Sequence, residues 1–204
     1  MDKAVALLSG GIDSPVAISL LQDRLEIVAI HFHQVPLTKE TEIEKVKELA
    51  RLLGVKKTYL VPFTTVFTEL VTKGNHRDYF ILSKIVMMRA AQVIAEREEA
   101  RYLITGENLA QVSSQTLSNL TTITSCVGMP ILRPVLAYDK QEIIDKAKKI
   151  GTYETSKGPE ICCLLGPKDP ATKSTKASIE AQLEKIGVML LIEKSLENME
   201  ILEL

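Results

Sequence analysis

Short apolar runs alternate along this chain with longer stretches in which apolar residues recur every three or four positions. This order predicts strands joined by crossover helices, which is typical of a parallel sheet covered on both faces. The expected strands are residues 4–8, 25–33, 57–61, 101–105 and 130–132. The expected helices are residues 15–21, 38–53, 63–73, 79–97, 140–149 and 175–186. The pattern therefore indicates an α/β fold with a doubly wound, parallel, five-stranded sheet.

The last quarter of the chain follows this pattern less closely. Residues 151–173 contain several glycines and prolines and have no period, so we expect a loop over the ligand site. Beyond Gly187, the apolar runs 188–192 and 199–202 fit either two short strands or a surface for a partner. We therefore divide the chain into a main domain, residues 1–173, and a C-terminal helix with an apolar tail, residues 174–204, packed on that domain or on a partner.

Composition narrows the class of protein. A chain of 204 residues with 46% hydrophobic and 25% charged residues suits one globular domain. Its 25 Lys and Arg against 26 Asp and Glu leave a net charge of −1, so the chain has no overall basic character for gripping nucleic acid unaided. No segment resembles a signal peptide or a membrane-spanning helix, which predicts a cytoplasmic protein without a membrane partner. The three cysteines do not make a disulfide framework.

The strand at residues 4–8 runs directly into Ser9-Gly10-Gly11-Ile12-Asp13-Ser14. The glycines let the backbone turn tightly and approach a ligand, while the two hydroxyls and the N–H groups opening the next helix add hydrogen-bond donors. This loop predicts a phosphate site, although a plain strand-to-helix turn would need glycine as well. It matches neither the Gly-x4-Gly-Lys-Ser/Thr loop nor the Gly-x-Gly-x-x-Gly turn. It resembles the pyrophosphate loop of enzymes that split ATP into AMP and pyrophosphate.

A second polar run, residues 106–117, follows the strand at 101–105 and so lies at the same edge of the sheet. Thr105-Gly106-Glu107 with Gln111-Val112-Ser113-Ser114-Gln115-Thr116-Leu117 resembles the signature of the 4-thiouridine synthetase family, also named for thiamine biosynthesis. Further agreements are His31-Phe32-His33 with Pro36, Arg133-Pro134 before Asp139-Lys140, residues 150–154, and residues 159–170 around Cys162-Cys163. The resemblance covers residues 3 to about 173. It implies a Rossmann-like domain of the adenine nucleotide alpha hydrolase type, a PP-loop ATP pyrophosphatase.

The resemblance implies an ATP-dependent tRNA sulfurtransferase. Such an enzyme adenylates a uridine carbonyl oxygen, and sulfur then displaces AMP to give 4-thiouridine. The resemblance assigns the ATP phosphates to Ser9, Gly10, Gly11 and Ser14. It gives Asp13 a role in holding Mg²⁺ or orienting the α-phosphate. It gives Lys140 the role of neutralising the negative charge that grows on the pyrophosphate leaving group. The plain alternatives are a helix-start carboxylate for Asp13 and a solvated first-turn lysine for Lys140.

The adenosine of ATP is expected at the end of the strand 25–33. The expected contacts beyond the loop are Ile30, His31, Phe32, Gly106 and Gln115. Backbone groups of Ile30 and His31 would read adenine, and Gly106 would allow the ribose or a phosphate to approach closely. His31 and His33 share one face of a strand and also suggest a metal site, but no third ligand is nearby in sequence. A packed or nucleotide-contacting role is therefore favoured for both.

The sulfur step is expected at a cysteine. By its spacing to Pro170, the resemblance assigns this role to Cys163, which would resolve the disulfide formed with a persulfide-carrying sulfur donor or carry the sulfur itself. Cys162 is adjacent, but consecutive side chains usually diverge. Cys126 fits a small core residue equally well. Together Cys126, Cys162 and Cys163 would also suit an iron–sulfur cluster, which the absence of a Cys-x-x-Cys pair disfavours.

RNA contact by this chain is expected to be modest. Arg77, Lys84 and Arg89 make at most a small basic patch, since Lys84-Ile85 stands where the family has two arginines. The family carries an RNA-binding module ahead of this domain, and no counterpart precedes the loop at residue 9. We therefore expect tRNA to be held with a separate RNA-binding subunit or domain, or by a homodimer. Two alternatives stay open: an ATP pyrophosphatase that adenylates a small metabolite, and a non-catalytic ATP- or AMP-binding module.

Overall fold

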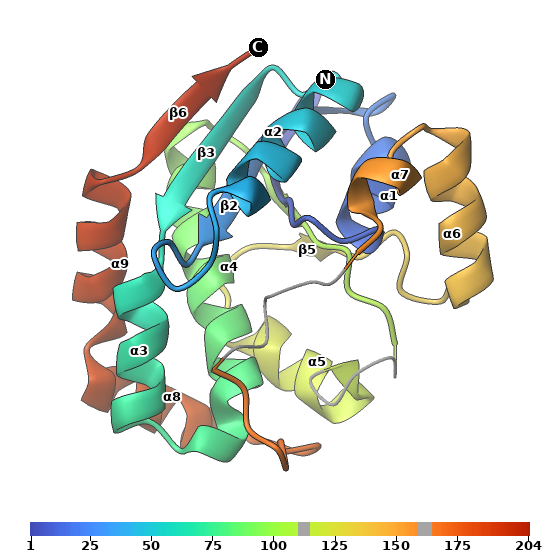
Figure 1. The fold of residues 1–204 in the computed structure, drawn as a ribbon. Coiled ribbons are helices and arrows are strands. Elements are labelled where there is room, and N and C mark those ends of the chain that lie inside the picture. Colours follow the sequence, from blue (N-terminus) through green and yellow to red (C-terminus); the bar gives the residue numbers. More distant parts are fainter. Residues whose placement is uncertain (110–114, 159–164) are drawn as a thin grey trace.

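The computed structural model describes residues 1–109, 115–158 and 165–204. Its centre is a sheet with the strand order β5-β4-β1-β2-β3-β6 (Figure 1). The strands are β1 (Asp2–Leu7), β2 (Leu25–His33), β3 (Lys57–Pro62), β4 (Tyr102–Ile104), β5 (Ile131–Leu132) and β6 (Glu200–Glu203). Strands β1 to β5 are parallel, whereas β6 pairs antiparallel with β3. The predicted sheet of five parallel strands is therefore corrected to six strands, the last of them antiparallel.

Helices cover both faces of this sheet. They are α1 (Asp13–Ser19), α2 (Thr41–Leu52), α3 (Thr64–Lys73), α4 (Tyr79–Arg97), α5 (Leu117–Ser125), α6 (Lys140–Lys149), α7 (Tyr153–Ser156), α8 (Lys176–Ile186) and α9 (Val188–Glu197), with a 3₁₀ turn η1 (His76–Asp78). Successive side chains of β1 point to opposite faces of the sheet and so belong to two different cores. Val5 packs in a core with α3, α4, α8 and α9, whereas Ala4 and Ala6 pack in a core with α1, α2 and α6. This arrangement confirms the doubly wound fold class.

The tail after Gly187 is where the sequence prediction was partly wrong. Residues 188–192 belong to helix α9, and only the run 199–202 contributes to a strand, β6. Five consecutive apolar residues fit a buried strand and a buried helix equally well. In α9, Val188 and Ile192 face the core, whereas Met189 and Leu190 are exposed. Helix α9 packs against α3 and α4, and part of the expected loop 151–173 forms α7.

The strand order places a ligand site at one edge of the sheet. From β1 the chain builds outward through β2 and β3 on one side and through β4 and β5 on the other. The reversal falls between β1 and β4, and ligands of doubly wound folds bind beyond the carboxyl ends of the strands at such a point. The loop that follows β1 lies there. No helix in the described parts of the chain combines the length and apolar character needed to cross a membrane.

Candidate active site

The loop between β1 and α1 is held in shape by its own hydroxyl groups. The Oγ atoms of Ser9 and Ser14 lie 3.1 Å apart, and Ser14 Oγ accepts a hydrogen bond of 2.9 Å from the backbone N–H of Ser9. Gly11 N–H donates to Ser9 Oγ over 3.3 Å. The predicted phosphate-binding residues Ser9, Gly10, Gly11 and Ser14 therefore form one preorganised turn. A concave set of N–H and hydroxyl donors is suited to a phosphate.

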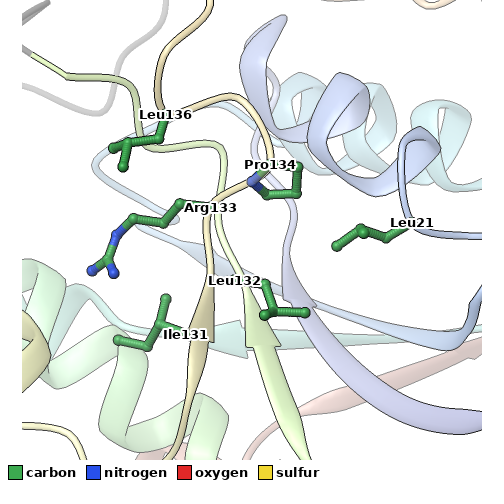
Figure 2. A pocket seen from close by; sticks show the side chains of 6 residues that line it. All are labelled: Leu21, Ile131, Leu132, Arg133, Pro134 and Leu136. Carbon is green, nitrogen blue, oxygen red and sulfur yellow. The ribbon is translucent and has the colours of Figure 1, made fainter.

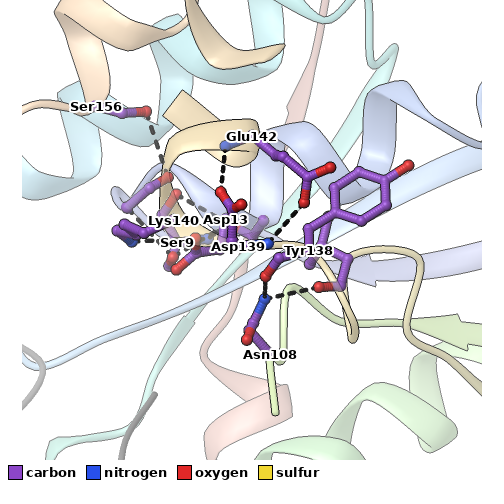
Figure 3. Close-up of polar contacts among 11 residues, drawn as sticks. Ser9, Asp13, Asn108, Tyr138, Asp139, Lys140, Glu142 and Ser156 are labelled. Carbon is purple, nitrogen blue, oxygen red and sulfur yellow. Dashed lines mark hydrogen bonds and ion pairs between the residues drawn. The ribbon is translucent and has the colours of Figure 1, made fainter. Parts of the chain in front are cut away.

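Lys140 reaches this loop from a distant part of the sequence (Figure 3). It is the first residue of α6, whose predicted N-cap, Asp139, forms a capping box with Glu142. Helix α6 packs on α1, and Lys140 Nζ lies 3.3 Å from Asp13 Oδ1. The structure thus brings together two of the predicted catalytic residues. The Lys140 side chain is 54% exposed, so its ammonium is accessible to an anion bound at the loop.

Gly106 closes the other side of the loop. A Cβ atom at this position would lie 2.5 Å from the backbone N of Ser14 and 2.7 Å from the carbonyl carbon of Asp13. No side chain fits so close to another backbone, so only glycine allows the end of β4 to pack against the start of α1. The sequence indicated a close approach between Gly106 and the ligand. In the structure the close approach is to the loop itself.

Glu107, the next residue, is a buried carboxylate between two cations. Its Oε1 atom accepts from Lys84 Nζ at 2.7 Å, and its Oε2 atom accepts from Arg133 Nε at 2.8 Å. Burial raises the pKa of Glu107, but the two cations outweigh it and hold the pKa below its usual range. Arg133 Nη2 is buried without a hydrogen-bond partner. Sequence reasoning did not anticipate this cluster, because its members come from α4 and from the ends of β4 and β5.

Asn108 links the end of β4 to the segment that leads into Lys140. Its side-chain amide donates to the carbonyls of Val135 and Tyr138 (Figure 3). Asn108 is 3% exposed, so these bonds replace its lost hydration. The two bonds help to fix the path that brings Lys140 to Asp13.

Two further contacts bring α2 and α7 to the phosphate loop. The side chain of Lys45 lies against Gly10, and Lys45 Nζ donates to the carbonyl of Ser156 at 3.0 Å. Ser156 Oγ in turn donates to the carbonyl of Gly11 at 3.3 Å (Figure 3). Neither residue was singled out from the sequence. A lysine on an amphipathic helix and a serine in a loop carry no local signal of such a contact.

The end of β2 carries buried polar atoms that lack partners. His31 Nδ1 bonds to the carbonyl of Leu8 at 2.9 Å, and His31 Nε2 is buried without a partner. Burial lowers the pKa of His31 to about 4, so the ring is neutral at physiological pH. His33 Nδ1 and Gln115 Oε1 are also buried and unpaired. Buried polar groups without partners are uncommon, and His31 and Gln115 are among the ATP contacts that the family resemblance implies.

Ile30 and Phe32, the other ATP contacts expected in β2, have side chains that pack within the fold, and the backbone contact expected for Ile30 stays a prediction. The Ile30 side chain is fully buried, and its carbonyl already accepts a hydrogen bond of 2.9 Å from Leu8 N. The Phe32 ring packs on Phe63 with a centroid distance of 4.5 Å. Of Ile30, His31 and Phe32, His31 is the one whose side chain has a buried polar atom without a partner.

Of the cysteines, Cys126 lies within the described residues, whereas Cys162 and Cys163 lie outside them. Cys126 is 6% exposed and follows α5. Burial raises the pKa of its thiol, which disfavours the thiolate needed for sulfur chemistry or for binding a cluster. Within residues 1–109, 115–158 and 165–204, no three His, Cys, Asp or Glu side chains are grouped to hold a metal ion. The metal alternative for His31 and His33 therefore gains no third ligand there.

The described residues on both sides of the two cysteines are held by hydrogen bonds to other parts of the fold. Before them, Ser156 contacts the phosphate loop as described above. After them, the carbonyl of Leu165 bonds to His76 Nε2 at 2.8 Å, and the carbonyl of Ala171 accepts from Asn119 Nδ2 at 3.0 Å. The chain at 156 is thus tied to the loop after β1, and the chain at 165–171 to η1 and α5.

The three residues considered for RNA contact do not form one basic surface. Lys84 is mostly buried and paired with Glu107. Arg89 is also mostly buried, and its Nη2 atom lies 2.7 Å from both carboxylate oxygens of Glu180. Arg77 is 62% exposed and paired with Asp169 at 3.0 Å. Their charges are therefore largely used within the fold.

A surface pocket of about 410 Å³ lies along the short edge strand β5 (Figure 2). Its lining is apolar apart from one guanidinium and consists of Leu21, Ile131, Leu132, Arg133, Pro134 and Leu136. None of these residues belongs to the loop Ser9–Ser14. The pocket is therefore separate from the phosphate-binding turn, although Arg133 belongs both to its lining and to the Glu107 cluster.

Comparison with known proteins agrees with this geometry. A Moorella thermoacetica protein named probable tRNA sulfurtransferase is 42% identical over 207 residues, 98% of this chain and 53% of that protein. The solved structure of a 4-thiouridine synthetase in complex with RNA and with bound ATP superposes with a TM-score of 0.93 at 37% identity, covering 98% of this chain and 55% of that one. This chain thus spans about half the length of these relatives.

A more distant structure shows the fold alone. The NMN synthetase of Francisella tularensis superposes with a TM-score of 0.61 at 15% identity, covering 95% of this chain and 84% of that one. The family model described as Thiamine biosynthesis protein (ThiI) matches residues 1–188. The match spans every residue that forms the turn, the Lys140–Asp13 pair and the Glu107 cluster. This chain therefore belongs to the ThiI family.

Proposed function

We propose that this chain is the catalytic part of an ATP-dependent tRNA sulfurtransferase that forms 4-thiouridine. The observation that carries the proposal is the Lys140–Asp13 ion pair at the Ser9–Ser14 turn, because it supplies a cation and a carboxylate beside donors suited to a phosphate. The family membership and the ATP bound in the related 4-thiouridine synthetase support it. The reaction begins with attack of a uridine carbonyl oxygen on the α-phosphate of ATP, which releases pyrophosphate.

In this proposal, residues of the turn bind the phosphates of ATP, and residues of neighbouring segments bind its adenosine. Hydroxyls of Ser9 and Ser14 and the backbone at Gly10 and Gly11 bind the leaving pyrophosphate, and the Lys140 ammonium neutralises the charge that develops on it. His31 Nε2 and Gln115 Oε1 face the adenosine and gain the partners they lack in the free protein. Gly106 acts indirectly, since it holds the end of β4 against the turn.

Mg²⁺ fits the same site. The Asp13 carboxylate is 27% exposed at the mouth of the turn, and Mg²⁺ is commonly bound by one or two carboxylates together with phosphate oxygens. We propose Asp13 as its protein ligand. Bound there, the ion would supply additional positive charge to the phosphates.

The sulfur step is assigned to Cys163. The terminal sulfur of a persulfide-carrying donor attacks the adenylated carbon and displaces AMP, which leaves the uridine joined to the donor through a disulfide. The Cys163 thiolate then attacks the donor sulfur of that disulfide, so that thiouridine leaves and a disulfide joins Cys163 to the donor. The contact of Ser156 with the phosphate loop, seven residues before Cys163, supports this assignment. The buried Cys126 is left with a structural role.

The remaining parts of the proposal concern organisation. We propose that tRNA is bound with the help of a separate RNA-binding domain or subunit, or by a homodimer, since Lys84 and Arg89 are occupied within the fold. We also propose that the main domain ends near residue 173 and that the protein is located in the cytoplasm. The packing of α8 and α9 on α3 supports treating residues 174–204 as an addition to the main domain.

Pyrophosphate release tests the proposal directly. The protein is incubated with ATP labelled in its β- and γ-phosphates, with and without unmodified tRNA. We expect release of labelled pyrophosphate that depends on tRNA and falls at least a hundredfold in Lys140→Met, while Lys149→Met at the other end of α6 leaves it unchanged. No pyrophosphate under either condition contradicts the proposal. Release that needs a small metabolite instead of tRNA favours metabolite adenylation.

A cysteine pair separates the two half-reactions. Cys163→Ala should release pyrophosphate at the normal rate but form no 4-thiouridine when the persulfide donor is present. Cys126→Ala is the matched control and should support both steps. Equal loss of both steps in Cys163→Ala would show that this cysteine is structural.

A further inference from the structure

Lys45 is a cation at the phosphate loop that no motif assigned. It lies on α2, and its side chain runs across Gly10: a Cβ atom placed on that glycine would lie 3.1 Å from Lys45 Cδ and 3.6 Å from Nζ. Its ammonium donates to the Ser156 carbonyl at 3.0 Å. Among the described residues, no carboxylate forms an ion pair with it. The positive charge of Lys45 is therefore left unneutralised beside the turn.

Lys47 on the same helix shows what an ordinary lysine of α2 does. Its Nζ lies 3.1 Å from Glu44 and 4.0 Å from Glu200, so its charge is balanced locally. The two lysines share a helix and differ in the face from which they extend. Only the side chain of Lys45 reaches the phosphate loop.

The charges around the turn give Lys45 a function. Lys140 and Asp13 balance each other at one side of the turn. Lys45 adds one net positive charge beside Gly10. A lysine ammonium is a common ligand for phosphate, and its three donors allow it to bind an anion while keeping the Ser156 carbonyl.

We propose that Lys45 binds the pyrophosphate portion of ATP at the Ser9–Ser14 turn. The inference rests on the proposed function, because it takes ATP as the ligand. Lys45 and Lys140 then both contact the leaving phosphates. Through the Ser156 carbonyl, Lys45 also joins the phosphate site to the end of α7.

Binding to three probes tests this role without turnover. Inorganic pyrophosphate, AMP and α,β-methylene-ATP are titrated by calorimetry into the wild type, Lys45→Met, Lys45→Arg and Lys47→Met. Loss of one charge-assisted hydrogen bond should weaken pyrophosphate and α,β-methylene-ATP roughly ten- to a hundredfold in Lys45→Met. AMP should bind within about twofold of the wild type, since it lacks the phosphates that Lys45 contacts. Lys45→Arg should retain most of the affinity, and Lys47→Met all of it.

The outcomes separate this inference from the proposed function. If the wild type binds none of the three probes, the proposed function is wrong and the inference is wrong with it. Equal affinity for pyrophosphate in the wild type and Lys45→Met overturns the role of Lys45 alone. Equal loss of AMP and pyrophosphate overturns it too, since that result means a distorted loop. Lys45→Gln keeps a donor for Ser156 and removes only the charge, so it carries the same expectation should Lys45→Met fail to fold.

Discussion

Two buried carboxylates stand at opposite edges of the sheet, on either side of β4. Glu98 precedes β4 at the amino edge, and its oxygens accept from Lys57 at 2.6 Å, from the Tyr59 hydroxyl and from Lys3 at 3.3 Å. Glu107 follows β4 at the carboxyl edge, and its oxygens accept hydrogen bonds from Lys84, Arg133 and the Thr105 hydroxyl. Each carboxylate is therefore held by two cations and one hydroxyl. The two clusters have the same chemistry and differ in their surroundings.

The surroundings show which edge is built for a ligand. Six of the buried side-chain atoms without hydrogen-bond partners lie in segments at or beyond the carboxyl ends of β2, β4 and β5: His31 Nε2, His33 Nδ1, Gln34 Oε1, Thr38 Oγ1, Gln115 Oε1 and Arg133 Nη2. The other two among the described residues are Thr58 Oγ1 in β3 and Glu69 Oε2 in α3. Around Glu98 the donors Lys57, Lys3 and Tyr59 are paired with the carboxylate, and one unpaired atom, Thr58 Oγ1, belongs to the neighbouring residue of β3. A buried polar atom without a partner is costly unless a ligand supplies one. The Glu98 cluster therefore serves stability, and the Glu107 cluster is placed to serve binding as well.

Neutralising each carboxylate gives the largest expected difference. Glu107→Gln leaves two buried cations without a counter-charge, so we expect a loss of about 3–5 kcal/mol in the free energy of unfolding. Because Lys84 and Arg133 then lose the group that orients them, we also expect pyrophosphate release to fall about a hundredfold. Urea unfolding and the pyrophosphate assay measure the two effects.

Glu98→Gln is the matched control. Its cations are more exposed than those of Glu107, so the stability loss should be smaller, and the rate of pyrophosphate release by the folded protein should stay within about twofold. Equal effects of the two variants on the rate would show that the edges do not differ in function.

Gly106→Ala tests the packing of β4 against the phosphate turn. The new methyl group would overlap backbone atoms of Asp13 and Ser14, which cannot yield as a flexible side chain can. We expect a loss of about 1–3 kcal/mol in stability together with loss of binding to α,β-methylene-ATP, because the turn is displaced. Gly128→Ala is the control, since its methyl group would meet only the side chain of Gln92. Normal nucleotide binding by Gly106→Ala would contradict the close packing.

Local patterns were enough to predict several elements of the fold. Strand β2 and helix α4 have the predicted bounds, and Asp139 caps α6 as expected, because each of these signals lies within a few residues. Helix α9 was missed because its first five residues are all apolar, which hides the period. Helix α5 was missed because its threonines and serines favour caps and turns over helix in a sequence.

The contacts of the site are a different case. The pairing of Lys140 with Asp13 spans 127 positions, and that of Lys45 with Ser156 spans 111. No period or spacing in the sequence encodes such meetings; they follow from which strands are neighbours. Lys140 was found through the family resemblance, and Lys45 had no such signal. The sequence therefore predicted the turn more fully than the charges gathered around it.

His31 should make the carboxyl edge sensitive to moderate acid. Its pKa is about 4 in the folded protein and near 6.5 when unfolded, so the unfolded chain binds an extra proton between these values. Stability due to the neutral ring is full above pH 6.5 and falls by up to about 1.4 kcal/mol per pH unit as the pH drops toward 4. Urea unfolding between pH 7 and 4 should show a shallower slope for His31→Gln than for the wild type. A His31→Gln slope as steep as the wild type's would contradict the assignment.

Glu98 should make the amino edge sensitive to stronger acid, with the smallest effect of the four. Burial raises its pKa, but hydrogen bonds from Lys57, Tyr59 and Lys3 outweigh this and lower it to about 2, against 4.5 for an ordinary glutamate. Its contribution is therefore complete above pH 4.5 and is lost as the pH falls toward 2. The difference in unfolding free energy between wild type and Glu98→Gln, measured at pH 7, 6.5, 5, 4 and 3, should stay constant from pH 7 to about 5 and then shrink. A difference that shrinks already between pH 6.5 and 5 would place the titration in the window expected for His31 and remove the distinction between the two edges.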